Sequence, residues 1–499
     1  MHISIQSIPS MAGLALISTL STACDKSASD ASSGESPGAE AAKKEAGNTA
    51  DASGDQEAGA GAEGVKADTE ETAAAEKPDC SGYSFSPLPN ADNTAPSPSG
   101  TLPAQLTAFA WDMFIGLNTA GDFNWQTSFM AIDDVMTGAK PDWKPTAPPR
   151  LGYAQADNGT SDGSGGYWLA DERGELVWYE MRLNRFEFDY IVKHGLYSGE
   201  GQETFAESTG IATPHGSTEV KAAWLPIAEA DAGKYVTTRG TIKGAKGVPR
   251  EDVLLGLVGF HILLKSTNGG ERWLWMTFEH SELTASFANE PHEVERAAKC
   301  QGKEGEDPVK FTAKPNEASP YTLQDYFSNG DCAPYATVVQ RINAIAPDVA
   351  KTNACAKAHL AGEQQEALAH YDLMGVQWFD PRATCGTPQP PLKTVCTQMS
   401  TPGCFYQGTE DFNYTYNCTA PNTDAPLSKT GFLNSDSGQG KPLTNVMLET
   451  YVQTIDCASC HADASIGVRD SKLASNYSFV FDHVGFSLDS NIEPKLRPF

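Results

Sequence analysis

Residues 457–461 read Cys-Ala-Ser-Cys-His, the attachment pattern of c-type haem. Two thiols separated by two residues match the two vinyl groups of haem, and the adjacent histidine then lies beneath the iron. The pattern therefore predicts thioether bonds from Cys457 and Cys460 to one haem c, and proximal iron ligation by His461. A thioredoxin-like pair is the alternative, but it needs a βαβ setting. Here apolar spacing over 443–456 predicts a helix that leads into the motif instead.

The second axial ligand must come from elsewhere in the chain. Only 38 residues follow His461 and none of them is methionine, although small cytochromes c carry a Met ligand well downstream of the motif. The ordinary small cytochrome c fold is therefore not expected. The distal candidates are His280, His261 and His483, although an isolated strand histidine is more often a hydrogen-bonded structural residue. Met447 is expected to be a core residue.

The elements that position these residues follow from apolar periodicity. Strands are predicted near 175–182, 218–224, 252–265, 272–280 and 371–379, and the stretch around His483 is also expected to be extended. Helices are predicted near 103–117, 184–194, 292–299, 335–346, 354–370 and 443–456. Because helices and strands do not alternate regularly, we expect an α+β fold with a mixed sheet rather than a doubly wound one.

One predicted hairpin determines where two of the histidines lie. A six-residue turn between 257–265 and 272–280 pairs Lys265 with Arg272. This register places His261 on the same face as His280, about 13 Å away along the strands. The two histidines are therefore not expected to ligate one iron together.

The eleven cysteines point to an oxidising compartment. Without Cys24 and the motif pair, eight cysteines remain, which is enough for up to four disulfides. Cysteines 385, 396, 404 and 418 lie in a Pro-, Gly- and Thr-rich region that is typical of a disulfide-stapled loop. A zinc site is the alternative, but this group has no C-x2-C spacing and no intervening histidine.

The N-terminal region resembles an export signal followed by a tether. The apolar run 11–23 ends at Cys24 and is too short to span a bilayer. It predicts a lipoprotein-type signal peptide over 1–23 and lipidation of Cys24. Ser21 replaces the usual leucine, so an ordinary cleaved signal peptide is the alternative. Residues 24–79 hold 14 acidic and five basic residues and almost no large apolar ones, which predicts a disordered tether.

Charge limits the partners of the chain. The formal net charge is −28, which argues against nucleic-acid binding and against charge-driven docking on anionic lipid. An acidic surface would instead attract a basic redox partner. We expect residues 80–440 to form a mixed α+β domain with disulfides, and residues 441–499 to be a haem-binding segment packed on it.

Several phrases resemble a family of exported bacterial cytochrome c proteins with one C-x-x-C-H near the C-terminus. They lie at 109–118, 179–192, 219–224, 259–261, 273–280, 374–378 and 443–451, the last running into the motif. The resemblance spans about residues 105 to 485. It implies a single covalently bound haem and an exported location in the cell envelope, periplasmic or on the surface. It implies no particular substrate or reaction.

Three functions are compatible with these features. The first is a lipid-anchored monohaem cytochrome that transfers electrons in the cell envelope. The second is a haem enzyme or sensor that binds peroxide or a diatomic gas at an open iron position. The third is a disulfide-stapled binding module without haem.

Overall fold

The computed structural model describes the chain in stretches between residues 78 and 484. The described residues are 78–86, 103–119, 121–145, 148–152, 167–266, 272–283, 286–301, 305–320, 322–362, 365–379, 384–385, 418–419, 432–434, 443–454, 457, 461, 464, 466–468, 473 and 475–484. The predicted signal peptide with Cys24, the tether up to residue 77, and three further cysteines, Cys396, Cys404 and Cys460, lie outside the described residues.

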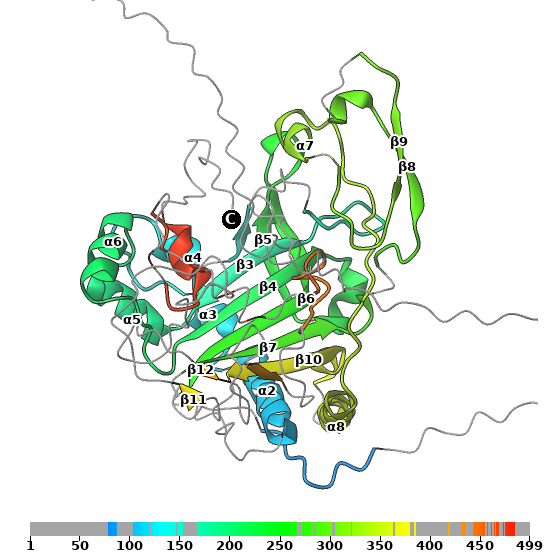
Figure 1. Cartoon of the computed structure of the whole chain (residues 1–499). Coiled ribbons are helices and arrows are strands. Elements are labelled where there is room, and N and C mark those ends of the chain that lie inside the picture. Colours follow the sequence, from blue (N-terminus) through cyan, green and yellow to red (C-terminus); the bar gives the residue numbers. More distant parts are fainter. Residues whose placement is uncertain are drawn as a thin grey trace, which may run out of the picture.

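The architecture is α+β, as the sequence predicts, and it is built around a nine-stranded sheet (Figure 1). The strands are β1 (Met130–Ala131), β2 (Arg150–Leu151), β3 (Trp178–Leu183), β4 (Thr218–Pro226), β5 (Thr237–Ile242), β6 (Arg250–Ser266), β7 (Arg272–His280), β10 (Tyr371–Phe379) and β13 (Phe432–Asn434). Their order is β1-β3-β4-β6-β7-β10-β13, with β5 also paired to β6 and β2 paired to β5. Two separate two-stranded sheets are β8 (His292–Arg296) with β9 (Val309–Ala313), and β11 (Thr384–Cys385) with β12 (Cys418–Thr419).

Short helices surround the sheet. The α-helices are α2 (Pro103–Asn118), α3 (Trp125–Ser128), α4 (Ile132–Val135), α5 (Arg185–His194), α6 (Gly199–Ser208), α7 (Gln324–Asn329), α8 (Pro347–Gly362) and α9 (Glu366–Ala369). The 3-10 helices are η1 (Glu229–Lys234), η2 (Ala245–Gly247), η4 (Ala298–Gln301) and η5 (Phe479–His483). In the part of the chain that the structure describes, no helix has the length and apolar character needed to cross a bilayer.

One face of the sheet is apolar and carries the main core. Side chains two residues apart on a strand share a face, so Phe260 and Phe278 point to the same side of β6 and β7. Phe114 of α2 stacks on Phe278 with ring centroids 4.3 Å apart, and Trp111 meets the same ring edge-on at 5.1 Å. Helix α8 packs beside α2 (Figure 1), where the Nε1 of Trp111 donates to the side chain of Asn353. These contacts explain why the helix predicted over 103–117 forms here.

The opposite face carries polar side chains, and described residues between 443 and 484 pack on it. Glu219, Lys221, His261, Trp275 and Thr277 all belong to this face, because the strand register places them side by side. The segment approaches the sheet closely, because a Cβ on Gly259 would lie only 2.9 Å from the Asn445 side chain. The side-chain amide of Asn445 also donates to the Thr277 hydroxyl and to the carbonyl of residue 278. The described part of the C-terminal segment therefore packs on the sheet.

The predicted hairpin register is wrong by one residue. The pairs are Ser266 with Arg272 and His261 with Thr277, rather than Lys265 with Arg272. Because successive strand residues alternate between faces, this shift moves His261 to the polar face, opposite to His280. The predicted shared face of the two histidines is therefore incorrect.

Three predicted helices and one predicted strand are also incorrect. Residues 292–296 form β8, because Val294 is buried by pairing with β9, and residues 335–346 form no helix. Residues 446–451 are turns, because Asn445 and Val446 bond to β7 instead of bonding along a helix. The stretch before His483 is the 3-10 helix η5, capped by the Ser478 side chain, which accepts from the amide of residue 480.

Two disulfides are present in the described residues. Cys80 is bonded to Cys355 of α8, and Cys300 to Cys332. In the small sheet of β11 and β12, the register places residue 385 opposite residue 418. The expectation of disulfides among the non-motif cysteines is therefore confirmed for four of the eight.

Candidate functional site

Two residues of the C-x-x-C-H motif lie at the polar face of the sheet. Cys457 and His461 line a cavity of about 60 Å³ together with side chains of β6, β7 and residues 443–452. The ring of His461 lies between Trp275 of β7, at 5.9 Å between centroids, and Phe479 of η5, at 5.0 Å. The two described motif residues therefore contact both aromatic and polar side chains of the sheet.

The hydrogen bonding of His461 determines its tautomer. Its Nδ1 is 2.7 Å from the Tyr477 carbonyl, which can only accept, so Nδ1 carries the proton. Burial lowers the pKa of His461 to about 4, so the ring is neutral at pH 7. The other ring nitrogen, Nε2, then holds a lone pair, and an Nδ1–H bond to a backbone carbonyl is the usual support of a metal-ligating histidine.

A strained turn presents the carbonyl that holds His461. Asn476 and Tyr477 have φ values of 59° and 64°, a left-handed conformation that asparagine tolerates and tyrosine rarely adopts. The Nζ of Lys265 donates to the Asn476 side chain at 2.7 Å, and Trp273 Nε1 donates to the carbonyl of Asn476 at 2.8 Å. Strands β6 and β7 thereby hold the turn that orients His461.

The cavity also holds a hydrogen-bonded acid and imidazole. The Nε2 of His261 bonds Oε1 of Glu449, and both side chains are mostly buried. The other carboxylate oxygen of Glu449 accepts from the amide of Asn445 at 3.0 Å. His261 of the sheet and His461 of the C-terminal segment therefore line the same cavity.

A buried acidic pair lies next to the strained turn. Glu187 of α5 and Glu219 of β4 are both enclosed, and Glu219 also faces Ser478. Burial raises the pKa of Glu219 to about 7, and burial followed by repulsion from Glu219 raises the pKa of Glu187. Lys265 is the nearby cation that opposes both shifts.

The structure places the other two histidine candidates outside the cavity. His280 lies on the far face, where its Nε2 donates to the Lys234 carbonyl at 3.0 Å and its Nδ1 accepts from the Glu282 amide. His483 is in η5, 3.9 Å from a carboxylate oxygen of Asp133, and it does not line the cavity. Burial lowers the pKa of His280 to about 4 and of His483 to about 3. Both therefore have surroundings typical of structural histidines.

Met447 lies in the core, as predicted. It is fully buried, and its carbonyl accepts a hydrogen bond from the Tyr179 hydroxyl at 2.8 Å. The backbone around it turns instead of forming the expected helix.

Several residues of this site belong to no motif of the sequence. Glu219 lies in the phrase 219–224, but that phrase does not predict its burial against Glu187, and nothing in the sequence marks Glu449. A signal was present in β4, where Glu219 and Lys221 are charged residues at alternate positions of an otherwise apolar strand. A charged pair on one face of a strand that is buried on both faces indicates a polar site.

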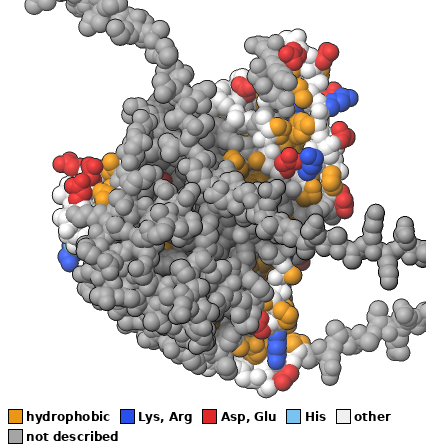
Figure 2. All heavy atoms as spheres, viewed as in Figure 1, with side chains coloured by type: hydrophobic (Ala, Val, Ile, Leu, Met, Phe, Trp, Pro, Cys, Tyr) orange, Lys and Arg blue, Asp and Glu red, His pale blue; other side chains and the backbone are white. Residues whose placement is uncertain are grey.

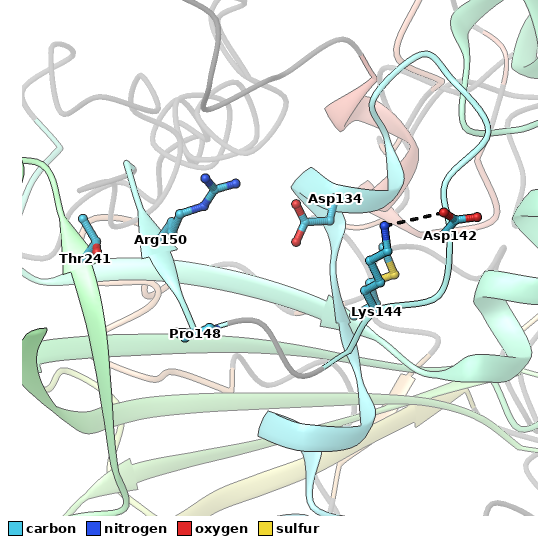
Figure 3. Close-up of a pocket in the computed structure, with 7 residues that line it drawn as sticks. Asp134, Asp142, Lys144, Pro148, Arg150 and Thr241 are labelled. Carbon is cyan, nitrogen blue, oxygen red and sulfur yellow. Dashed lines mark ion pairs between the residues drawn. The ribbon is translucent and has the colours of Figure 1, made fainter. Parts of the chain in front are cut away.

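A second, larger hollow lies near the strand pair β2 and β5. Its volume is about 430 Å³, and Asp134, Lys144 and Arg150 are among the residues that line it (Figure 3). Lys144 pairs with Asp142 at 3.5 Å, but both side chains are more than 70% exposed, so this pair adds little. Charges of both signs line this open surface, and no residue predicted from the motif lies there.

The donor types of the first cavity can be compared with those that a metal ion or a haem would need. Among the described residues, no three His, Cys, Asp or Glu side chains come together as a metal site. Cys457 supplies a thiol, and His461 supplies a neutral imidazole in the tautomer that a haem iron needs. The cavity is far smaller than the roughly 300–1,000 Å³ of cofactor pockets. The cavity of this structure is therefore too small to hold a haem, although its donor types are those that a haem uses.

Comparison of the chain with family models, with curated proteins and with solved structures found no match.

Proposed function

We propose that the chain is an exported monohaem c-type cytochrome that transfers electrons in the cell envelope. The observation that carries the proposal is the state of His461 within the C-x-x-C-H motif: neutral, with Nδ1–H bonded to a backbone carbonyl. In this tautomer the lone pair lies on Nε2, so His461 could ligate an iron beside the two thiols of the motif.

The roles of the residues follow from their chemistry. Cys457 and Cys460 would hold the haem through thioethers, and His461 Nε2 would ligate the iron. Haem supplies a one-electron redox centre when it is bound. The rings of Trp275 and Phe479 pack against the His461 ring, and the carbonyl of Tyr477 holds the orientation of that ring.

Export and anchoring belong to the same proposal. Cys24 would carry the lipid, and the acidic tether over 24–79 would hold residues 80–440 and the haem segment 441–499 away from the membrane. The haem segment packs on a large sheet, so the proposed protein does not have the ordinary small cytochrome c fold.

A surface next to the haem segment suits a basic redox partner. Glu200, Glu203 and Glu207 are exposed on α6, and acidic side chains gather at that edge of the molecule (Figure 2). Gln202 of the same helix accepts a hydrogen bond from the amide of Gly467, six residues after His461. The acidic side chains of α6 therefore lie on a helix that touches the haem segment.

The haem assay tests the proposal directly. The exported protein should give the pyridine haemochrome spectrum of a thioether-linked haem, and a Cys457→Ser/Cys460→Ser variant should lose covalent haem. The control is Cys300→Ser/Cys332→Ser, which also replaces two cysteines but removes a disulfide outside the motif, and it should keep its haem. A wild-type protein without haemochrome, or a motif variant that retains covalent haem, contradicts the proposal.

A further inference from the structure

We propose that the hollow near α4, β2 and β5 binds a small zwitterion, such as an α-amino acid or a short peptide. In this proposal Arg150 holds the carboxylate of the ligand and Asp134 holds its ammonium group. The site goes beyond the proposed electron transfer, and neither of the described motif residues lines it. Its volume of about 430 Å³ is within the roughly 300–1,000 Å³ of small-molecule pockets.

The first observation is the placement of two opposite charges. Arg150 of β2 and Asp134 of α4 both line the hollow, and their charged groups face one another across it (Figure 3). Figure 3 marks no ion pair between these two residues, so the guanidinium nitrogens and the carboxylate oxygens are more than 4 Å apart. A molecule that lies between them and satisfies both must present a negative end and a positive end.

The second observation is the balance of the remaining charges. Lys144 pairs with Asp142 at 3.5 Å, so the charges of these two lining residues offset one another. A guanidinium carries five N–H donors and can bind a carboxylate through two of them, and a carboxylate accepts from an ammonium group. A simple anion at Arg150 would be repelled by Asp134, and a simple cation at Asp134 would be repelled by Arg150. The hollow therefore favours a zwitterion over either.

The third observation is that the walls carrying Arg150 and Asp134 are anchored. Strand β2 pairs with β5 so that Arg150 lies opposite Thr241, and the Thr241 amide donates to the carbonyl of the residue before Arg150 at 3.0 Å. Leu151, the next residue of β2, is buried. Helix α4 is held by its two buried side chains, Ile132 and Val135.

The wall that carries Asp142 and Lys144 is anchored by Arg182. The side chain of Arg182 is buried and paired with Glu180, and its Nη1 donates to the carbonyl of Pro145 at 3.2 Å. Walls that are fixed before binding lose little conformational freedom when a ligand enters. The hollow is therefore preformed.

Apolar surface completes the lining. Met130 and Pro148 both line the hollow, and a methionine side chain adapts to ligands of different shape. A zwitterion with an apolar side chain can therefore bury that side chain here while its charged ends meet Arg150 and Asp134. L-leucine and the dipeptide L-alanyl-L-leucine have this chemistry and serve as probes.

Isothermal titration calorimetry of the exported protein tests the inference. Acetate and isobutylamine, which each carry one charged end, are the control ligands. At least one of the two zwitterions should bind, and both control ligands should bind at least about fivefold more weakly. The affinity for the zwitterion should fall as salt is added, because salt screens charges that are open to solvent.

Two variants assign the two ends of the ligand. Asp134→Asn should weaken binding of the zwitterion at least about fivefold but should not weaken binding of acetate, whereas Arg150→Gln should weaken both. The matched controls are Asp122→Asn and Arg239→Gln, whose side chains are exposed and do not line the hollow. Both controls should bind like the wild type. Circular dichroism checks that each variant folds.

Three outcomes overturn the inference. No binding of either zwitterion at millimolar concentration shows that the hollow is not a site for this class of ligand. Acetate that binds as tightly as the zwitterions shows a simple anion site. Zwitterion binding that survives both Asp134→Asn and Arg150→Gln occurs elsewhere on the chain. These measurements do not depend on haem, so the haem assay remains an independent test of the proposed function.

Discussion

At the scale of the residue, burial decides the protonation of the groups around the site. Glu219 is buried and its pKa is raised to about 7, whereas burial lowers the pKa of His461 to about 4. Both shifts favour the neutral form, because an enclosed charge loses its hydration. Lys265 remains as the cation, and it bonds the turn that supports His461.

The shift at Glu219 predicts a pH-dependent stability. The folded pKa lies above the ordinary value of 4.5, so its contribution to stability is complete below pH 4.5 and is lost as the pH rises to about 7. Glu219→Gln removes this loss. As the pH rises from 5 to 8, the free energy of unfolding of the variant should increase relative to that of the wild type by roughly 1–3 kcal/mol.

Denaturant unfolding at both pH values checks this prediction. Glu203→Gln is the matched control, since Glu203 is exposed on α6 and should show no such change. If the free energies of unfolding of Glu219→Gln and wild type differ by the same amount at pH 5 and at pH 8, the raised pKa of Glu219 is contradicted.

His280, His461 and His483 act in the opposite direction. Their lowered pKa values remove stability as the pH falls below 6.5.

At the scale of the element, α2 is held to the sheet by aromatic contacts. Phe114 stacks on Phe278 and meets Tyr371 at 5.1 Å between ring centroids. Its side chain is fully buried, so truncation would leave a cavity between helix and sheet.

Phe114→Ala should therefore lower the free energy of unfolding by about 3–5 kcal/mol. The matched control is Phe186→Ala on α5, whose ring is 42% exposed. We expect that change to stay within about 0.5 kcal/mol. Urea unfolding followed by circular dichroism measures both, and similar losses in the two variants would show that Phe114 does not anchor α2.

At the scale of the whole molecule, net charge predicts how a partner approaches. The chain has a formal charge of −28, and the acidic side chains of α6 flank the proposed haem segment. Charges of one sign around a redox centre accelerate association with a partner of the other sign, and salt screens the effect.

Glu200→Gln/Glu203→Gln/Glu207→Gln should slow electron transfer with a small basic redox protein severalfold at low ionic strength. The matched control replaces the exposed Glu290, Glu293 and Glu295 by glutamine, an equal change of charge at β8 and the loop before it, across the molecule from α6 (Figure 1). Stopped-flow rates should differ between the two triple variants at low salt and converge near 1 M, where the Debye length is about 3 Å. Equal rates at low salt exclude α6 as the docking surface.

The sequence by itself determined what depends on near neighbours in the chain. The C-x-x-C-H spacing is a local pattern, and alternation along 272–280 or 371–379 reports one strand at a time, so these strands were predicted correctly. Helix α5 was equally local, because Asn184 caps it and Gly195 ends it in a left-handed conformation.

Only the tertiary structure decided which of the distant side chains meet. A one-residue difference in the hairpin register moved His261 from the face of His280 to the face of His461, and nothing in the strand pattern could reveal that difference. The bond between His261 and Glu449 joins residues 188 positions apart. Such contacts depend on strand register and on which segment covers the polar face, and both arise from packing of the whole chain.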